Sequence, residues 1–171
     1  MTLTDAQIDR YSRQIIVPRI GGRGQERILA ARMLLAGDAR DIEVPRAYLA
    51  GAGVGTIVTD ADQSPGRFDL ALALISSEAT RKIAQEIAGN RDVQALIVAR
   101  LDAPGRIAVV SDGHSVEASM LTEVGTRSEA ADFIAMLATA EAFKLLAGYA
   151  DSPTPATIEF DGFQTRTRVH P

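Results

Sequence analysis

The segment after the first apolar strand contains both glycine and acidic residues. Glycine at this place favours phosphate binding, whereas acidic residues oppose it. Residues 33–36 predict a short strand, and the stretch GDARDIE, residues 37–43, follows it. Glycines directly after a first strand let backbone N–H groups and a helix N-terminus reach phosphates. Here Asp38, Asp41 and Glu43 stand instead. Like charges about 4 Å apart repel by roughly 4 kcal/mol at an effective dielectric near 20, against roughly 0.3–1 kcal/mol that a helix N-terminus offers an anion. We therefore interpret these acids as ordinary capping residues of a helix.

Two further features are similar to parts of a nucleotide site. The run GAGVG, residues 51–55, contains glycines but precedes a strand, whereas the phosphate fingerprint follows one. We interpret it as the turn between a helix and the second strand. Asp60 ends that strand, 23 residues after Gly37, a spacing that suits a carboxylate accepting ribose hydroxyls. The alternative is a polar strand end that faces solvent.

Composition excludes several chemistries. The chain has no cysteine, which excludes disulfides, thiolate zinc sites and a thioester on this chain. Its two histidines, His114 and His170, are interpreted as exposed loop and tail residues, and no metal-ligand spacing is visible. The net charge of -4, with acids and bases interspersed, argues against a nucleic-acid or acidic-membrane partner. We expect no metal site.

Size and hydropathy predict one soluble, cytoplasmic domain. The 171 residues are 46% hydrophobic and 23% charged, as in an ordinary globular protein. The opening residues carry acids and no apolar core, so no signal peptide is visible. No apolar run reaches the roughly 18 residues that a membrane span needs.

Strand and helix patterns alternate along the chain, which predicts a Rossmann-like α/β fold: a mostly parallel sheet flanked by helices, with a C-terminal β-hairpin. Thr4 and Gln7 resemble a capping box for a helix from Asp5 to about Ser12. Pro45 suits the first turn of another helix. The strands are expected at residues 33–36, 57–59, 70–75, 95–99, 107–110, 157–160 and 165–169.

The C-terminal part is expected to contain a long helix and the hairpin. Ser128 is expected to cap a helix that runs to about Ala147, with apolar residues around most of its circumference. Asp161-Gly162 is a common hairpin turn. Within the single domain of residues 1–171, we expect an N-terminal helical segment, a reduced Rossmann-like core, and this helix with the hairpin: residues 1–31, 32–127 and 128–171.

Five stretches follow one another along the chain: RYSRQIIVPRIGGRGQERILAARMLLAG (10–37), AGVGTIVTDAD (52–62), FDLALALISSEATR (68–81), EAFKLLAG (141–148) and IEFDGF (158–163). In this order they resemble the ThiF/MoeB/HesA family, the ubiquitin-activating-enzyme-like proteins. The first stretch is the most specific and resembles the opening of family members up to the first Rossmann strand. The resemblance implies a fold that binds ATP with magnesium and adenylates the C-terminal Gly-Gly of a ubiquitin-like or sulfur-carrier protein.

The resemblance also implies site residues. Gly37 is what remains of the family's glycine run, and Asp60 and Asp62 match the acidic pair at the end of the second strand. Arg13 matches an arginine that reaches the partner subunit's nucleotide site, or else it forms a structural ion pair. These residues define the expected cofactor-binding set, as a vestigial nucleotide site.

The sequence departs from the family at the positions that carry the chemistry. The family's magnesium-binding Asp falls on Ser76 and the neighbouring Asn on Ser77, and a hydroxyl is a poor sole magnesium ligand. The arginine and lysine that grip the triphosphate have no match, and Arg67 is only a stray loop arginine. Asp60 and Leu70 are close in sequence, so we expect residues 61–69 to form an extended link in place of the family's third strand and its helix.

We therefore expect a catalytically inactive scaffold or regulatory partner, a pseudoenzyme without catalytic residues or cofactors. We expect it to form a homodimer, or a heterodimer with a related active subunit, through the face that carries the long C-terminal helix. A ubiquitin-like or sulfur-carrier protein is a further candidate partner. The alternative is an adenylyltransferase subunit that still binds ATP and magnesium weakly and acts with a partner chain. A generic dinucleotide-binding domain is disfavoured by the missing glycines.

Overall fold

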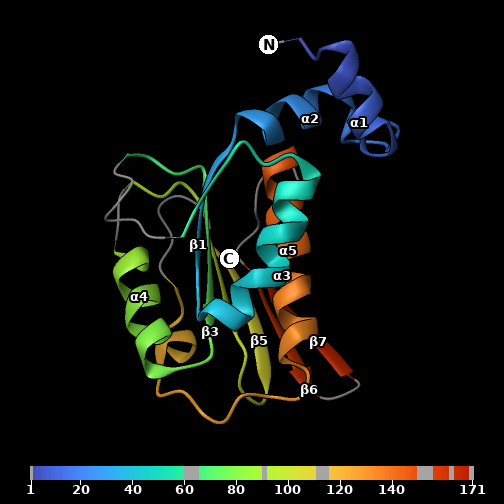
Figure 1. Ribbon diagram of the computed structural model, residues 1–171. Coiled ribbons are helices and arrows are strands. Elements are labelled where there is room, and N and C mark those ends of the chain that lie inside the picture. Colours follow the sequence, from blue (N-terminus) through green and yellow to red (C-terminus); the bar gives the residue numbers. More distant parts are fainter. Residues whose placement is uncertain are drawn as a thin grey trace.

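The computed structural model describes residues 2–59, 66–89, 92–110, 116–149, 156–161 and 164–169. Within these residues one sheet has seven strands: β1 (Arg32–Ala36), β2 (Thr56–Val58), β3 (Leu70–Ile75), β4 (Leu96–Arg100), β5 (Gly105–Val110), β6 (Ala156–Asp161) and β7 (Gln164–Val169). Their order is β2-β1-β3-β4-β5-β6-β7 (Figure 1). The first four in this order run parallel, and β5, β6 and β7 each run antiparallel to the strand before. The expected Rossmann-like sheet with a C-terminal hairpin is confirmed.

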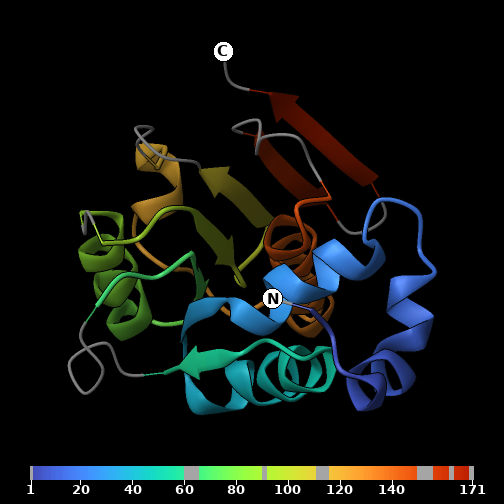
Figure 2. The ribbon, with the colours of Figure 1, turned by 90° about the horizontal axis from the view of Figure 1, so that it is seen from above.

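Helices cover both faces of the sheet. α3 (Ala39–Ala52) and α5 (Ala131–Ala147) lie side by side on one face, and α4 (Glu78–Ala88) lies on the other (Figures 1 and 2). The short 3-10 helix η1 (Ala118–Leu121) packs against α4 and β4. α1 (Asp5–Ile15) and α2 (Gly21–Ala30) precede β1 and lie at its amino end (Figure 1). No helix among the described residues is long and apolar enough to cross a membrane.

Two apolar clusters, one on each face of the sheet, hold these layers together. Leu35 and Ile134 are fully buried on the α3–α5 face, and Met120 of η1 is fully buried on the other. Successive side chains of a strand point to opposite faces. The uninterrupted apolar strands LALALI (70–75) and LIVA (96–99) therefore supply both clusters, as strands covered on both faces do.

The start of α1 agrees with its sequence. The capping box is confirmed: the Gln7 backbone N–H donates to Thr4 Oγ1 at 3.3 Å, and the Thr4 N–H donates to Gln7 Oε1 at 2.9 Å. α1 runs on to Ile15, past the predicted end. At Gly53, which has a φ of 93°, an added Cβ would lie 2.7 Å from the Tyr11 ring, so only glycine lets α1 pack this closely.

The predicted start of α3 is wrong. The helix begins at Ala39, so Pro45 lies in its interior rather than in its first turn, and Gly51 belongs to the helix. A proline in that position leaves the carbonyl of Asp41 without its usual helical partner. The helix continues nevertheless because Pro45 and Leu49 are buried against the sheet side of the domain. Gly53, in the left-handed conformation, ends it.

The long C-terminal helix starts later than predicted. α5 begins at Ala131, and Ser128 lies in the turn before it, where its Oγ accepts from the Ala130 N–H at 3.1 Å. The predicted end at Ala147 is confirmed, with Gly148 at a φ of 67°.

In the sheet, β1 lies between β2 and β3 and runs parallel to both. Among the described residues β2 is an end strand of the sheet, so no strand of that part of the chain lies beyond it. Of the expected extended link, residues 61–69, residues 61–65 lie outside the described residues. Its described end, residues 66–69, is not helical, and Phe68 forms a bridge to Val93.

Candidate functional site

The carboxyl ends of β1 and β3 form the place where a doubly wound fold binds its ligands. The two strands are neighbours, but α3 leaves β1 towards one face of the sheet and α4 leaves β3 towards the other. Such a divergence opens a crevice at the carboxyl ends of the strands. In this chain the crevice contains Gly37, Asp38, Asp41, Ser76 and, from the segment before α5, Arg127.

Gly37 is required by packing. A Cβ at this position would lie 2.8 Å from Ile42 Cγ2 and 3.1 Å from Leu74 Cβ. Both contacts are shorter than van der Waals separation, and both neighbours belong to the walls of the crevice. The glycine therefore lets the end of β1 approach α3 and β3, which is a structural role that does not depend on phosphate.

The two acids after Gly37 converge on one hydroxyl. Ser76 Oγ lies 2.9 Å from Asp38 Oδ2 and 2.5 Å from Asp41 Oδ2. A serine hydroxyl has a single proton, so it donates to one carboxylate at a time. Asp38 occupies the N-cap position of α3, but its side chain makes no cap hydrogen bond, so the predicted capping role is wrong for its carboxylate.

Arg127 neutralises the buried carboxylate. Its Nε and Nη2 donate to Asp41 Oδ1 at 3.1 and 2.8 Å, and the Asp41 side chain is 0% exposed. Nη2 also donates to Asp132 Oδ1 at 2.5 Å, whereas Arg40 lies farther from Asp41, at 3.6 Å. Burial alone would lower the pKa of Arg127, but the hydrogen bonds with Asp132 and Asp41 outweigh it and raise the pKa above its usual range.

A second buried ion pair holds the segment that delivers Arg127. Arg100, at the end of β4, pairs with Asp102, and its guanidinium also donates to the carbonyls of Thr122 at 3.1 Å and Glu123 at 2.8 Å. Asp102 in turn accepts from the Gly125 N–H at 2.9 Å. Burial would raise the pKa of Asp102, but these hydrogen bonds outweigh it and lower the pKa below its ordinary value.

The structure brings together only part of the predicted site. Gly37 lies in the crevice, whereas Arg13, at the end of α1, lies beyond the amino end of β1, at the opposite end of the sheet (Figure 1). Asp60 and Asp62 lie outside the described residues. Arg67 precedes β3 and therefore also lies at its amino end. Glu43 is exposed, and no hydrogen bond or ion pair between described residues joins it to the crevice.

The residues that sequence reasoning missed are Arg127 and the Arg100–Asp102 pair. Arg127 ends a stretch without periodicity, so nothing in its neighbourhood indicates which way it points. Arg100 and Asp102 do carry a signal: they interrupt an apolar strand at i and i+2, which places them on the same face of that strand. Charges so placed in a buried strand must pair.

Chemically, the crevice is a closed network of hydrogen bonds and ion pairs. Its guanidinium faces carboxylates of the same chain, and its hydroxyl is shared between two of them. In the described part of the chain no group of three or more His, Cys, Asp or Glu side chains is arranged to hold a metal ion.

Known proteins share parts of this sequence. No family model matches the chain. The adenylyltransferase and sulfurtransferase uba4 of Pyricularia oryzae is 50% identical over 56 residues, which is 32% of this chain and 11% of that protein. The protein of the same name from Sclerotinia sclerotiorum is 54% identical over 55 residues, 31% of this chain and 12% of that protein. The match therefore spans only a small fraction of the length of these relatives.

Solved structures share the fold over nearly the whole chain. E. coli MccB superposes with a TM-score of 0.68 at 12% identity, covering 94% of this chain and 71% of that one. PaaA superposes with a TM-score of 0.59 at 15% identity, covering 98% and 75%. The fold is thus that of a ThiF/MoeB-like Rossmann domain. The local identity to uba4 and the shared fold both support the resemblance of this chain to the ThiF/MoeB family.

Proposed function

We propose that this chain is a non-catalytic member of the ThiF/MoeB family that acts in the cytoplasm as a scaffold or regulatory partner. The observation that carries the proposal is the Asp41–Arg127 ion pair in the crevice between β1 and β3. The anion beside the start of α3 is the chain's own carboxylate, and the guanidinium that faces it is already neutralised.

The residues of the crevice do not fit a nucleoside triphosphate. A phosphate about 4 Å from the Asp41 carboxylate would be repelled by roughly 4 kcal/mol. If the phosphate instead drew Arg127 away, it would leave a carboxylate with 0% side-chain exposure unpaired, at a cost of about 3–5 kcal/mol. Either way the loss exceeds what the helix N-terminus contributes to anion binding, about 0.3–1 kcal/mol. We therefore derive no reaction step through ATP.

The second candidate is an adenylyltransferase subunit that binds ATP weakly and acts on the C-terminus of a ubiquitin-like or sulfur-carrier protein with a partner chain. The names of the similar proteins favour it, since uba4 is an adenylyltransferase and MccB has been solved with ATP. In that case Asp60 and Asp62 are the residues to contact the nucleotide, with Arg13 acting on the partner's site.

The titration that separates these candidates is ATP binding by calorimetry, with and without magnesium, with E. coli MccB as the positive control. We expect a dissociation constant no better than about 1 mM for this chain, given the repulsion above. The Asp41→Asn variant, which releases Arg127 from one carboxylate, should bind ATP more tightly than the parent. Asp132→Asn is the matched control, because this carboxylate is 86% exposed and screened by solvent. A micromolar constant for the unaltered chain would sink the proposal.

A scaffold needs a partner surface, and we propose that the chain pairs through the outer face of α3 and α5, as a homodimer or with a related active subunit. Val44 of α3 and Phe133 of α5 are large apolar side chains that are 60% and 59% exposed. Large exposed apolar patches are uncommon on monomers, so we expect a partner to cover these side chains. Sedimentation equilibrium at micromolar concentration should give twice 18.2 kDa, and Phe133→Glu should restore the monomer mass. A mass of one chain across the concentration range would contradict homodimerisation.

A further inference from the structure

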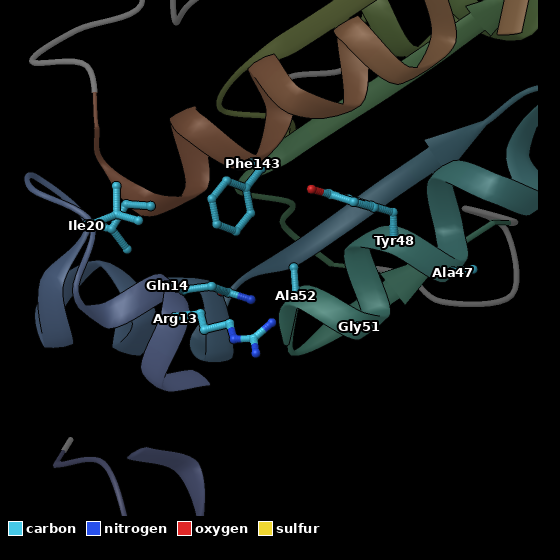
Figure 3. Close-up of a pocket in the computed structure, with 9 residues that line it drawn as sticks. Arg13, Gln14, Ile20, Ala47, Tyr48, Gly51, Ala52 and Phe143 are labelled. Carbon is cyan, nitrogen blue, oxygen red and sulfur yellow. The ribbon is translucent and has the colours of Figure 1, made fainter. Parts of the chain in front are cut away.

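A pocket lies at the end of the domain opposite the crevice. It has a volume of about 460 Å³ and is enclosed by the C-terminal turns of α1 and α3 and by α5 (Figure 3). Pockets for small molecules in proteins measure roughly 300–1,000 Å³. The space is therefore large enough for a small organic molecule, and it is separate from the crevice between β1 and β3.

The lining of this pocket combines an apolar interior with a single cation. Val17, Ile20 and Phe143 supply apolar surface, and Tyr48 adds a ring with a hydroxyl group. Among the described residues that line the pocket, Arg13 is the only charged one and none carries a carboxylate. Figure 3 shows the Arg13 and Gln14 side chains extending from α1 towards Ala52 of α3, with Phe143 across from them.

Two side chains of the pocket, Arg13 and Gln14, have polar groups without a partner among the described residues. Arg13 is exposed and makes no hydrogen bond or ion pair with the described residues, so the structural ion pair considered for it is not present in that part of the chain. The side-chain oxygen of Gln14 is buried without a hydrogen-bond partner among the described residues. A buried amide oxygen without a partner costs about 1–3 kcal/mol. The Gln14 oxygen is an acceptor that a donor of a ligand or water could satisfy, whereas Arg13 offers donors to an anion.

We propose that this pocket binds a small amphipathic organic acid, a molecule with an apolar body and a single carboxylate. The apolar body packs against Phe143 and Val17, and the carboxylate accepts hydrogen bonds from Arg13. A cation is disfavoured because the positive charge of Arg13 would repel it. The inference does not depend on whether the chain binds ATP, since Arg13 and the crevice lie at opposite ends of the sheet.

Decanoate and decylamine, which share a chain length and differ in charge, are the probes. Titrated into the full chain by calorimetry, decanoate should bind with a dissociation constant on the order of 0.1 mM, and decylamine at least about tenfold more weakly. Arg13→Gln should weaken decanoate binding by about tenfold. Arg23→Gln is the matched control: Arg23 is exposed on α2, lies outside the pocket lining and should leave the affinity unchanged.

The Gly51→Leu variant separates a loss of ligand binding from a loss of folding. Gly51 lines the pocket within α3, and an added Cβ would meet no atom within 4 Å. The Cβ of a leucine therefore meets no clash, leucine favours a helix more than glycine does, and we expect its longer side chain to occupy part of the pocket. Decanoate binding should be abolished while the melting temperature is retained. Equal affinity for decanoate and decylamine, binding that survives Gly51→Leu, or no binding at millimolar decanoate would each overturn the proposal. ATP titrations of the same variants report on the proposed function separately.

Discussion

Replacement of Arg127 tests whether the crevice is held by a buried ion pair. Arg127→Met keeps most of the aliphatic length of the side chain but removes both donors to Asp41, which lie at 2.8 and 3.1 Å. Breaking a buried pair costs about 3–5 kcal/mol, since it leaves a buried charge without compensation. The Arg127 side chain is 22% exposed, so we take the lower end, about 3 kcal/mol. For a domain of this size that corresponds to a fall in melting temperature of about 6–12 °C.

The same carboxylate offers an internal control. Arg40 approaches Asp41 Oδ1 at 3.6 Å, and its side chain is 66% exposed, so Arg40→Met should change the unfolding free energy by no more than about 0.5 kcal/mol. The double variant Asp41→Asn with Arg127→Met should recover much of the loss, because no unpaired charge remains buried. Urea unfolding at neutral pH measures all three variants. If Arg127→Met and Arg40→Met are equally harmless, the reasoning about the crevice is refuted.

Three further changes have defined outcomes. Gly37→Ala should destabilise the fold by about 1–3 kcal/mol in urea unfolding, because its Cβ would lie 2.8 Å from Ile42 Cγ2. Gly51→Ala is the control and should stabilise the fold by about 0.5–1 kcal/mol. Similar changes in unfolding free energy for the two variants would contradict the packing role of Gly37. Asp102→Asn should cost about 3 kcal/mol at neutral pH. Folding lowers the pKa of Asp102 from its ordinary 3.8, so the stability that its charge provides is present above that value and is lost as the pH falls through the lower, folded-state pKa. If the unfolding free energies of the parent and the variant fall equally on acidification, Asp102 does not have this role. Thr4→Ala should cost about 1 kcal/mol by removing the capping box, and an unchanged melting temperature would show that α1 is held by docking alone.

The sequence was sufficient to predict the elements whose signals are local. The strand at residues 70–75 lies where its apolar run indicated, and α1 starts where the Thr4 and Gln7 capping box indicated. Errors arose where tertiary packing overrides local preference. α3 keeps Pro45 in its interior because that residue and Leu49 are buried, and α5 starts after Ser128 because its hydroxyl is used in the preceding turn.

The crevice was only half predictable for a related reason. That acids replace the glycine run is visible from the residues that follow Gly37. The cation that neutralises Asp41 is not visible in the sequence, because Arg127 is 86 residues away and reaches Asp41 only through the folded segment before α5. The pocket around Arg13 was equally hidden, because its walls come from α1, α3 and α5, which no sequence period relates.

The ion pair between Asp41 and Arg127 also limits how this protein can change by mutation. The charges of Asp41 and Arg127 compensate each other in the crevice. Replacing only one of the two residues therefore leaves the charge of the other without a partner, next to a site where the Asp41 side chain has no contact with solvent. Restoring glycines after β1 would therefore not by itself recreate an anion site, because Asp41 would still occupy Arg127. Two replacements must occur together, and each intermediate is less stable than the starting chain. Single mutations that reopen the crevice for anions are therefore expected to be selected against, because each of them destabilises the fold.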